Sequence, residues 1–228
     1  MLEVKDLSFA YKDQQIFEHL SFTVEDGEIV GLVAPNGTGK TTLLKLLCGL
    51  LPTGADTLTL NGLKLYSKRI AYLKQLFFLE SSNQLYQELT VRDHLTYVKE
   101  VWHSKVEIGP VVESLEMGSY YKKVIKDLSL GMKQHVLLAM YIISDAQTML
   151  IDEPLNGLDP TSIQEFEEVF LQLKAKGKSL VISSHQMDSV GRTCDHVFFL
   201  KDQTLHDVTN TGQDMMGVYN HFFPKAGA

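Results

Sequence analysis

A glycine-rich run at positions 34–42, Ala-Pro-Asn-Gly-Thr-Gly-Lys-Thr-Thr, has the composition of a phosphate-binding loop. It follows apolar residues 29–33 and precedes a second apolar stretch at 43–47, an order that predicts strand, turn and helix. Such a loop points successive backbone N–H groups at one spot, and the helix N-terminus adds its positive dipole end. Lys40 would hold the terminal phosphates, and the Thr41 hydroxyl would ligate Mg²⁺. The loop thus predicts a nucleoside triphosphate as ligand, with Asn36, Gly37, Thr38, Gly39 and Thr42 as further binding residues.

The first position of this loop departs from the pattern Gly-x-x-x-x-Gly-Lys-Ser/Thr. Ala34 stands where a glycine would permit unusual backbone angles, although alanine is the mildest replacement. The alternative interpretation is an ordinary turn between a strand and a helix. That alternative gives Lys40 no role at a helix start, where a cation is electrostatically disfavoured.

A second candidate group lies at residues 149–154, where an apolar run ends in Asp152 and Glu153. A buried strand would place Asp152 at its carboxyl end near the phosphates, where it can hold Mg²⁺ through water. Glu153 would accept a proton from an attacking water, or orient it. Adjacent strand residues point to opposite faces, so the two carboxylates would have different roles. The alternative is a strand end with two solvated acids.

A third group opens a helix at residues 128–134, Leu-Ser-Leu-Gly-Met-Lys-Gln. Ser129 is a good N-cap, and apolar residues continue at helical spacing through 136–141. An ordinary capped helix would explain this pattern. Together with a phosphate loop, however, the helix start at Ser129 predicts a second anion-binding site.

Composition excludes some functions. The 228 residues carry 21 basic and 28 acidic side chains, a net charge of −7, which argues against a general nucleic-acid-binding protein. The apolar run at 136–143 is far shorter than the about 20 residues of a membrane span, and the N-terminus does not predict a secretion signal. Cys48 and Cys194 are isolated, which is typical of buried thiols in a reducing cytosol rather than of a disulfide or metal site.

The pattern predicts an α/β fold: a P-loop NTPase core with a mixed sheet, an N-terminal antiparallel β subdomain and an inserted α-helical subdomain. Thr90 and Asp93 form an expected capping box in the helical part. We expect one domain over residues 1–228, with a catalytic core at 1–79 and 146–207, the helical subdomain at about 80–145 and a weakly patterned tail at 208–228. The expected strands are 2–24 with a turn at 12–15, 28–34, 57–60, 149–152, 179–183 and 196–200, and the expected core helices are 39–49, 161–175 and 186–193.

The order and spacing of these motifs, over about residues 2–207, resemble the nucleotide-binding subunit of ATP-binding-cassette (ABC) transporters. The resemblance implies that Ser129 and Gly131 contact the γ-phosphate held by a second protomer. It also implies that Asp159, in the Leu-Asp-Pro run at 158–160, belongs to a loop that crosses the dimer interface. The remaining roles implied by the resemblance are adenine stacking for Tyr11, sensing of Mg²⁺ and the attacking water for Gln75 after a strand near 70–74, and γ-phosphate contact for His185.

Some residues depart from the family pattern. Leu130 replaces the more frequent second glycine of the 128–134 motif, His135 stands where arginine is common, and Lys74 stands where proline is usual before Gln75. These departures leave the residues with assigned phosphate chemistry in place. We expect them to affect the rate of turnover more than the existence of activity.

The resemblance further implies two copies, each binding ATP and Mg²⁺, that close as a homodimer and drive a separate integral-membrane permease from the cytoplasmic face of the membrane. The sequence of residues 128–134 resembles that of the same motif in bacterial exporters with a separate permease. Residues 76–79 with Leu85 and Tyr86 are expected either to receive the permease or to form the core of the helical subdomain. The alternatives are a non-transport ABC ATPase with a regulatory or scaffold role, a small-molecule kinase, and a module that binds ATP without hydrolysis.

Overall fold

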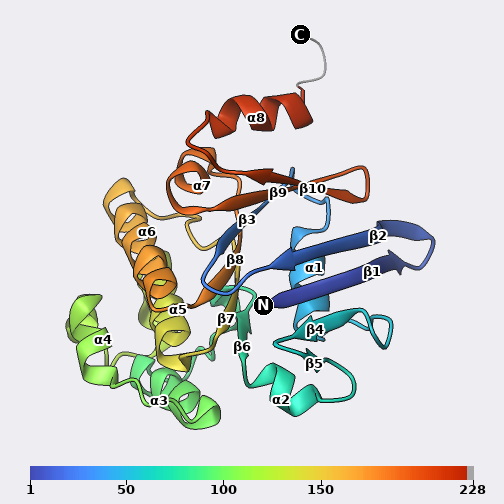
Figure 1. Cartoon of the computed structure of the whole chain (residues 1–228). Coiled ribbons are helices and arrows are strands. Elements are labelled where there is room, and N and C mark those ends of the chain that lie inside the picture. Colours follow the sequence, from blue (N-terminus) through green and yellow to red (C-terminus); the bar gives the residue numbers. More distant parts are fainter. Residues whose placement is uncertain (225–228) are drawn as a thin grey trace.

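The computed structural model describes residues 1–224, and its centre is a six-stranded mixed sheet in the order β10-β9-β3-β8-β7-β6 (Figure 1). Only the β10–β9 pair in this sheet is antiparallel. The parallel arrangement brings the carboxyl ends of β3, β7 and β8 to one edge. The strands are β3 (Ile29–Val33), β6 (Leu76–Leu79), β7 (Thr148–Asp152), β8 (Ser179–Ser183), β9 (His196–Lys201) and β10 (Thr204–Thr209).

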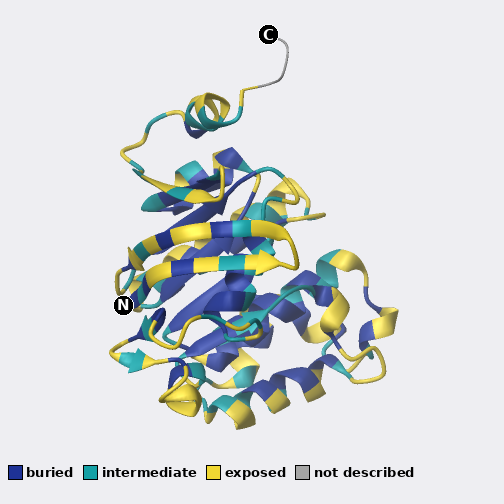
Figure 2. Cartoon of the chain, turned by 90° about the vertical axis from the view of Figure 1, so that its right-hand side faces the viewer, coloured by how far each residue is buried: buried dark blue, intermediate teal, exposed yellow. Residues whose placement is uncertain are grey.

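A second, antiparallel sheet has the order β2-β1-β4-β5 and lies beside the first. It contains β1 (Leu2–Tyr11), β2 (Gln14–Val24), β4 (Leu58–Leu60) and β5 (Leu63–Lys64). In Figure 2, β1 and β2 alternate between buried and exposed residues, whereas the central strands are buried. One face of the β1–β2 hairpin is therefore core and the other is solvated.

The helices divide into three groups: α1 with α2, which contacts the C-terminal end of α1, the helices of residues 82–175, of which α3 to α6 lie on the left of Figure 1, and those near the C-terminus. The first group is α1 (Lys40–Leu47) and α2 (Arg69–Leu73). The second is η1 (Ser82–Gln84), α3 (Val91–Trp102), α4 (Ile108–Ser114), η2 (Met117–Ser119), η3 (Ile125–Asp127), α5 (Leu130–Ser144) and α6 (Pro160–Ala175). The third is α7 (Met187–Thr193) and α8 (Met215–Phe222).

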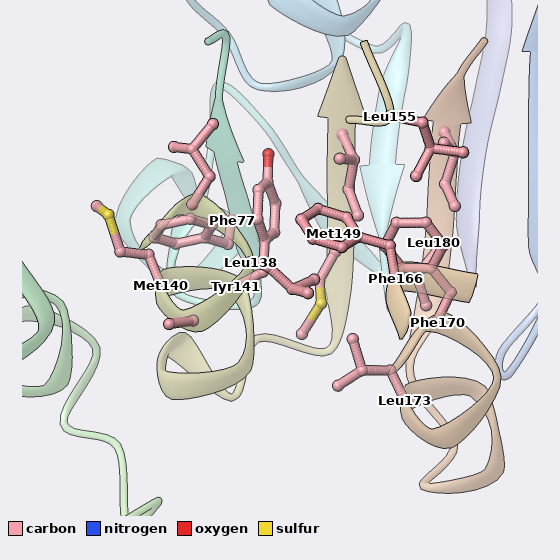
Figure 3. Close-up of a cluster of buried hydrophobic side chains, with 14 of the residues drawn as sticks. Phe77, Leu138, Met140, Tyr141, Met149, Leu155, Phe166, Phe170, Leu173 and Leu180 are labelled. Atoms are coloured by element: carbon pink, nitrogen blue, oxygen red, sulfur yellow. The ribbon is translucent and has the colours of Figure 1, made fainter. Parts of the chain in front are cut away.

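The central sheet separates two hydrophobic cores, and β3 contributes to both. Ile29 and Val33 pack with residues of α5 and α6, whereas Val30 and Leu32 pack with α1 and the antiparallel sheet. Figure 3 shows the first core, where Tyr141, Phe166, Phe170 and Met149 meet side by side. Because both faces of the sheet are covered, its edge is held rigidly where the loops emerge.

Tyr141 of α5 illustrates how the helical subdomain is fixed to the sheet. Its ring is fully covered by the first core, and its hydroxyl donates to the Leu150 carbonyl of β7 at 2.5 Å. Burial raises the pKa of this phenol, so the hydroxyl keeps its proton as a donor. This bond joins α5 directly to the strand that ends in Asp152.

The fold class is confirmed, and the expected strands and core helices lie within a few residues of the observed ones, except that the strand expected near 70–74 is the helix α2. The Thr90–Asp93 capping box is present. The region assigned to a weakly patterned tail, 208–228, instead contains the end of β10 and the helix α8, while residues 225–228 lie outside the described part. Along residues 1–224, no helix has both the length and the apolar character required to cross a bilayer.

Candidate functional site

The phosphate loop joins β3 to α1, and glycine is needed at two of its positions. Gly37 and Gly39 have φ angles of 82° and 111°, in the region that disfavours other residues. A Cβ on Gly39 would lie 2.8 Å from Ile16 and 2.9 Å from the Phe17 ring, so β2 packs directly against the loop. Ala34 is buried and has no positive φ, which explains why alanine is tolerated there.

Lys40, the first residue of α1, lies over this loop with only 6% of its surface exposed. Its ammonium donates to the Ala34 carbonyl at 2.9 Å and lies 3.4 Å from Glu153 Oε1. A buried cation requires such partners because desolvation is costly. The lysine is therefore held at the mouth of the loop, where an anion would be bound.

Asp152 ends β7 at the same edge of the sheet. Thr41 Oγ1 donates to Asp152 Oδ2 at 2.5 Å, and the hydroxyl of Ser183 on β8 donates to the other carboxylate oxygen. Asp152 and Ser183 face each other in the β7–β8 ladder, which fixes this contact. The structure thus brings together Thr41 and Asp152, two of the three residues predicted at the Mg²⁺ site; the third, Gln75, lies elsewhere.

Glu153 has an unusual backbone and an unsatisfied carboxylate oxygen. Its φ is 46°, and its N–H donates to Ser183 Oγ at 2.9 Å, which holds this conformation. Oε2 accepts from His185 Nδ1 at 2.8 Å, whereas the buried Oε1 has no hydrogen bond from the described residues and lies at ion-pair distance from Lys40. Strained residues with a free buried acceptor are concentrated at functional sites. Oε1 is available to a water or a hydroxyl.

A cavity of about 360 Å³ connects most of the predicted residues. Tyr11 stands at the end of β1, is 45% exposed and packs edge-on against Phe9. Thr38 does not line this cavity, and its hydroxyl donates to Pro35 O at 2.7 Å. The lining comprises Tyr11, Gln14, Ile16, Asn36, Gly37, Gly39, Lys40, Thr41, Thr42, Asp152 and Glu153.

Gln14 and Ile16 were not predicted as site residues. They line the cavity because the β1–β2 hairpin folds over the loop. The available signal was their position directly after Tyr11 across a two-residue turn. The sequence alone does not tell how closely the hairpin approaches Gly39, since that contact joins residues distant in the chain.

The Ser129 motif lies outside this cavity. Ser129 is exposed and accepts a hydrogen bond from the Met132 N–H, so it caps α5 as predicted. Gly131 follows in the first turn of that helix. We call the first cavity the cradle. Next to it, a second cavity of about 380 Å³ is lined by Leu130, Gln134, Asn156 and Gly157, and the two cavities share Asp152 and Glu153.

Asp159 is the N-cap of α6 and is likewise exposed. Its carboxylate accepts from the N–H groups of Thr161 at 3.0 Å and Ser162 at 3.1 Å. The backbone N–H and the hydroxyl of Ser162 lower the pKa of Asp159 because they stabilise its charged form. Within one chain its role is to start a helix, and no contact to the phosphate loop is present among residues 1–224.

The predicted role of Gln75 is wrong. Gln75 precedes β6, and the neighbouring Leu76 pairs with Thr148 at the amino end of β7, the edge opposite to Asp152. Its side chain accepts from Asn61 Nδ2 at 2.6 Å. The reason is that residues 69–73 form α2 instead of a strand, so the strand begins one residue after Gln75. Glu80 and Ser81 follow β6 at the edge where Asp152 lies.

The atoms of the site fit a nucleotide with magnesium. Glycines leave space for backbone approach, a buried ammonium and a free carboxylate oxygen face each other, and Thr41 lies beside Asp152. Within the described residues, no group of three His, Cys, Asp or Glu side chains forms a metal site by itself. Mg²⁺ that takes few protein ligands typically completes its shell with phosphate oxygens and water. The fold and the cradle therefore define a P-loop nucleotide-binding protein.

Comparison with known proteins gives the family. The model of the family described as ABC transporter matches residues 17–156. The lantibiotic transport ATP-binding protein SrtF of Streptococcus pyogenes is 30% identical over 201 residues, which cover 88% of this chain and 86% of that protein. The Nod factor export ATP-binding protein I of Rhizobium meliloti strain 1021 is 32% identical over 205 residues, with 88% of this chain and 61% of that protein covered.

The solved structure of an ATP-binding subunit of an ABC transporter superposes with a TM-score of 0.89 at 28% identity, covering 97% of this chain and 99% of that one. A nucleotide-free ATP-binding cassette superposes with a TM-score of 0.80 at 20% identity, which supports the fold. The chain therefore belongs to the ABC transporter family, as an ATP-binding and ATP-hydrolysing subunit.

Proposed function

We propose that two copies of this chain close around two molecules of ATP with Mg²⁺ and that hydrolysis drives a separate membrane permease. One observation carries this proposal. Lys40, Glu153 and His185 contact one another at the cradle, whereas Ser129 of the same chain is exposed and does not line it. A second copy that places its Ser129 over this cradle would supply the anion contacts that one chain lacks.

The chemistry begins with an exchange of partners. A terminal phosphate entering the loop competes for the Lys40 ammonium, which lies 3.4 Å from Glu153 Oε1. Magnesium held through Thr41 and Asp152 would neutralise charge on the phosphates. Glu153 Oε1, already without a hydrogen bond, then accepts the proton of an attacking water. His185 holds Oε2 at 2.8 Å and so orients the carboxylate.

In the closed dimer, we assign Ser129 and Gly131 to the γ-phosphate in the other chain's cradle, and Asp159 to the interface. ATP binds the closed arrangement better than the open one, so it shifts the population toward closure. Loss of the γ-phosphate removes the shared anion and lets the copies separate. This cycle gives the chain a mechanical output that a permease can use.

An exposed apolar stripe, formed by Tyr86, Tyr97 and Val101, is our candidate for the permease contact. Tyr86 lies against His94, with ring centroids 6.1 Å apart, and the other two residues follow His94 at helical spacing on α3. Leu76 and Phe77, which were considered for this role, are 3% exposed and belong to the cores. A cytoplasmic segment of the permease with apolar side chains would cover this stripe.

We further propose transport out of the cell, with the subunit held at the cytoplasmic face of the membrane through its permease. Support comes from the relatives named for lantibiotic transport and Nod factor export. Purification of the chain with its native membrane partner, followed by replacement of Tyr97 by Asp, tests the stripe. The exchange should release the permease while leaving ATP binding by the isolated chain unchanged.

The replacement of Glu153 by Gln tests the core of the proposal. Hydrolysis should fall by about 10²–10⁴-fold, because the amide cannot accept the proton. ATP binding should persist, and size-exclusion chromatography with ATP and Mg²⁺ should show a stable dimer. Glu88→Gln is the matched control, since Glu88 is exposed and pairs with the exposed Lys126. Phosphate release at the parent rate by Glu153→Gln would exclude Glu153 as the base.

A further inference from the structure

Leu130, the residue that departs from the family glycine, lies on another glycine of the same chain. A Cβ placed on Gly157 would be 2.7 Å from Leu130 Cδ2, so the leucine side chain occupies the space above the Gly157 backbone. Gly157 also has a φ of 76°, in the left-handed region. In the adjacent position, the Leu158 side chain lies 4.0 Å from where a Cβ on Gly131 would stand.

Contacts between the same two segments continue one turn further along α5. His135 Nδ1 donates to Gly131 O at 3.0 Å, and its Nε2 lies 3.4 Å from Glu165 on α6. The imidazole ring packs edge-on against Phe166, with centroids 5.2 Å apart. The first two turns of α5 therefore contact the segment that runs from Gly157 into α6, first through Leu130 and then through His135.

These contacts connect the two halves of the proposed site within one chain. The segment touched by Leu130 begins just after Glu153 and ends at Asp159, and α5 begins just after Ser129. A glycine at position 130 could not make the contact to Gly157, because it has no side chain. Leu130 is half-exposed at 52%, so the rest of its side chain faces the cavity shared with Glu153.

We propose that Leu130 is a positioning residue that fixes the helix start carrying Ser129 and Gly131 to the loop at 156–159 of its own chain. The inference rests on the proposed function of the dimer. The loop at 156–159, which follows Glu153, then sets the orientation of Ser129 in the same chain. In this orientation Ser129 reaches the nucleotide bound by the other chain. Each chain consequently presents its Ser129 and its Asp159 as one unit.

The first test measures hydrolysis against protein concentration for the full chain, Leu130→Ala and Leu130→Met. Alanine removes the contact with Gly157, whereas methionine keeps a long apolar side chain able to restore it. We expect Leu130→Ala to need an about tenfold higher protein concentration for half-maximal specific activity, with the parent behaviour largely recovered by methionine. ATP affinity of the separated chain, measured by calorimetry, should stay within about twofold of the parent, since Leu130 does not line the cavity at the phosphate loop.

Leu171→Ala is the matched control, because Leu171 lies on α6 and is similarly exposed, at 43%. A general loss of stability would also lower the melting temperature of the separated chain without nucleotide, which is measured for each variant. An identical concentration dependence for the parent and Leu130→Ala would overturn the inference. If the parent itself neither binds ATP nor hydrolyses it, the proposed function fails, and the inference fails with it.

A double-mutant cycle with Gly157→Ala gives the second test. The added methyl should impair dimerisation through backbone strain and through its clash with Leu130. In the Leu130→Ala background the clash is absent and only the strain remains, so the effect of Gly157→Ala should be smaller by about three- to tenfold. Equal effects of Gly157→Ala in both backgrounds would show that the two residues are not coupled and would contradict the proposal.

Discussion

The phosphate side and the Ser129 side of this chain differ in how their polar groups are satisfied. On the phosphate side, Lys40 is buried and Asp152 and Glu153 are partly buried, and all three bond to one another or to the loop, α1 and β8. On the other side, Ser129 and Asp159 are exposed, and within residues 1–224 the side chain of each bonds only to the first turn of its own helix. The phosphate side is thus assembled within a single chain, whereas Ser129 and Asp159 on the other side face the solvent.

The difference follows from the elements that carry each side. Asp152 and Ser183 are opposed in the β7–β8 ladder, and both faces of that sheet are packed, so their separation is fixed. Ser129 instead starts a helix in a subdomain joined to the sheet through side chains such as Tyr141. Rigid placement suits groups that bind phosphate and perform chemistry, whereas an outward helix start suits recognition of a second molecule.

The replacement of Lys40 by Ala should have the largest effect, and it should act on the phosphate side alone by weakening ATP binding. Removal of the cation should weaken ATP binding by at least about 100-fold, since charge-assisted bonds to phosphate are among the strong ones. Calorimetry with the separated chain measures this. Ser129→Arg, on the other side, should leave the same affinity within about twofold. Comparable losses in both variants would contradict the division into two sides.

Mixing the two inactive variants sharpens the comparison. Neither Lys40→Ala nor Ser129→Arg should hydrolyse ATP alone, because every site in those homodimers has one defective half. In the mixed dimer, the cradle of the Ser129→Arg chain meets the intact Ser129 of the Lys40→Ala chain, so one complete site forms. Phosphate release should therefore reappear on mixing, up to about a quarter of the parent rate if pairing is random and the sites act independently. No recovery at any ratio would mean that sites are not shared between chains.

His185→Ala should have a smaller effect that is confined to turnover. Glu153 Oε2 loses its 2.8 Å partner but keeps its position through the Ser183 contacts to its backbone. We expect hydrolysis to fall by about 10- to 100-fold, within or just below the range of general-base contributions, while ATP affinity changes little. Steady-state kinetics separate the two, as the loss should lie in kcat and not in KM. An unchanged kcat would show that His185 has no role in orienting Glu153 for hydrolysis.

The phosphate side could be predicted from the sequence because its signals are local. The loop from Ala34 to Thr42 and the acids that end β7 each lie within one strand–turn unit, where residue type and spacing decide the conformation. The close approach of Phe17 to Gly39 could not be predicted, since it depends on how the second sheet packs over the first. The same holds for Leu130 and Gly157, which are 27 residues apart in sequence numbering, from position 130 to 157.

Gln75 shows where the sequence misled us. The run Ile70-Ala71-Tyr72-Leu73 is apolar and short, so its pattern does not distinguish a strand from one helical turn. In the structure the segment is the helix α2, in which Tyr72 is fully buried and its hydroxyl donates to Leu47 O. This tertiary contact favours the helix over a strand. The strand then begins at Leu76, and its carboxyl end delivers Glu80 and Ser81, not Gln75, to the edge where Asp152 lies.

The smallest effect should come from Asp159→Ala, measured on the separated chain without nucleotide. Loss of the cap on α6 should lower the melting temperature at neutral pH by roughly 2–4 °C. The folded-state pKa of Asp159 lies below its ordinary value because Ser162 stabilises the charged form. Its contribution is therefore complete above the ordinary pKa of an aspartate and is lost as pH falls through the lowered value.

The difference in melting temperature between the parent and Asp159→Ala should accordingly shrink toward zero in acid. Asp214→Ala offers a matched control, since Asp214 caps α8 through the Met216 N–H, far from the Ser129 motif. Both variants should lose a cap, but only Asp159→Ala should also weaken ATP-dependent dimerisation. An equal loss of dimer in both would assign Asp159 to helix stability alone, and the outward side of the chain would then rest on Ser129 and Gly131.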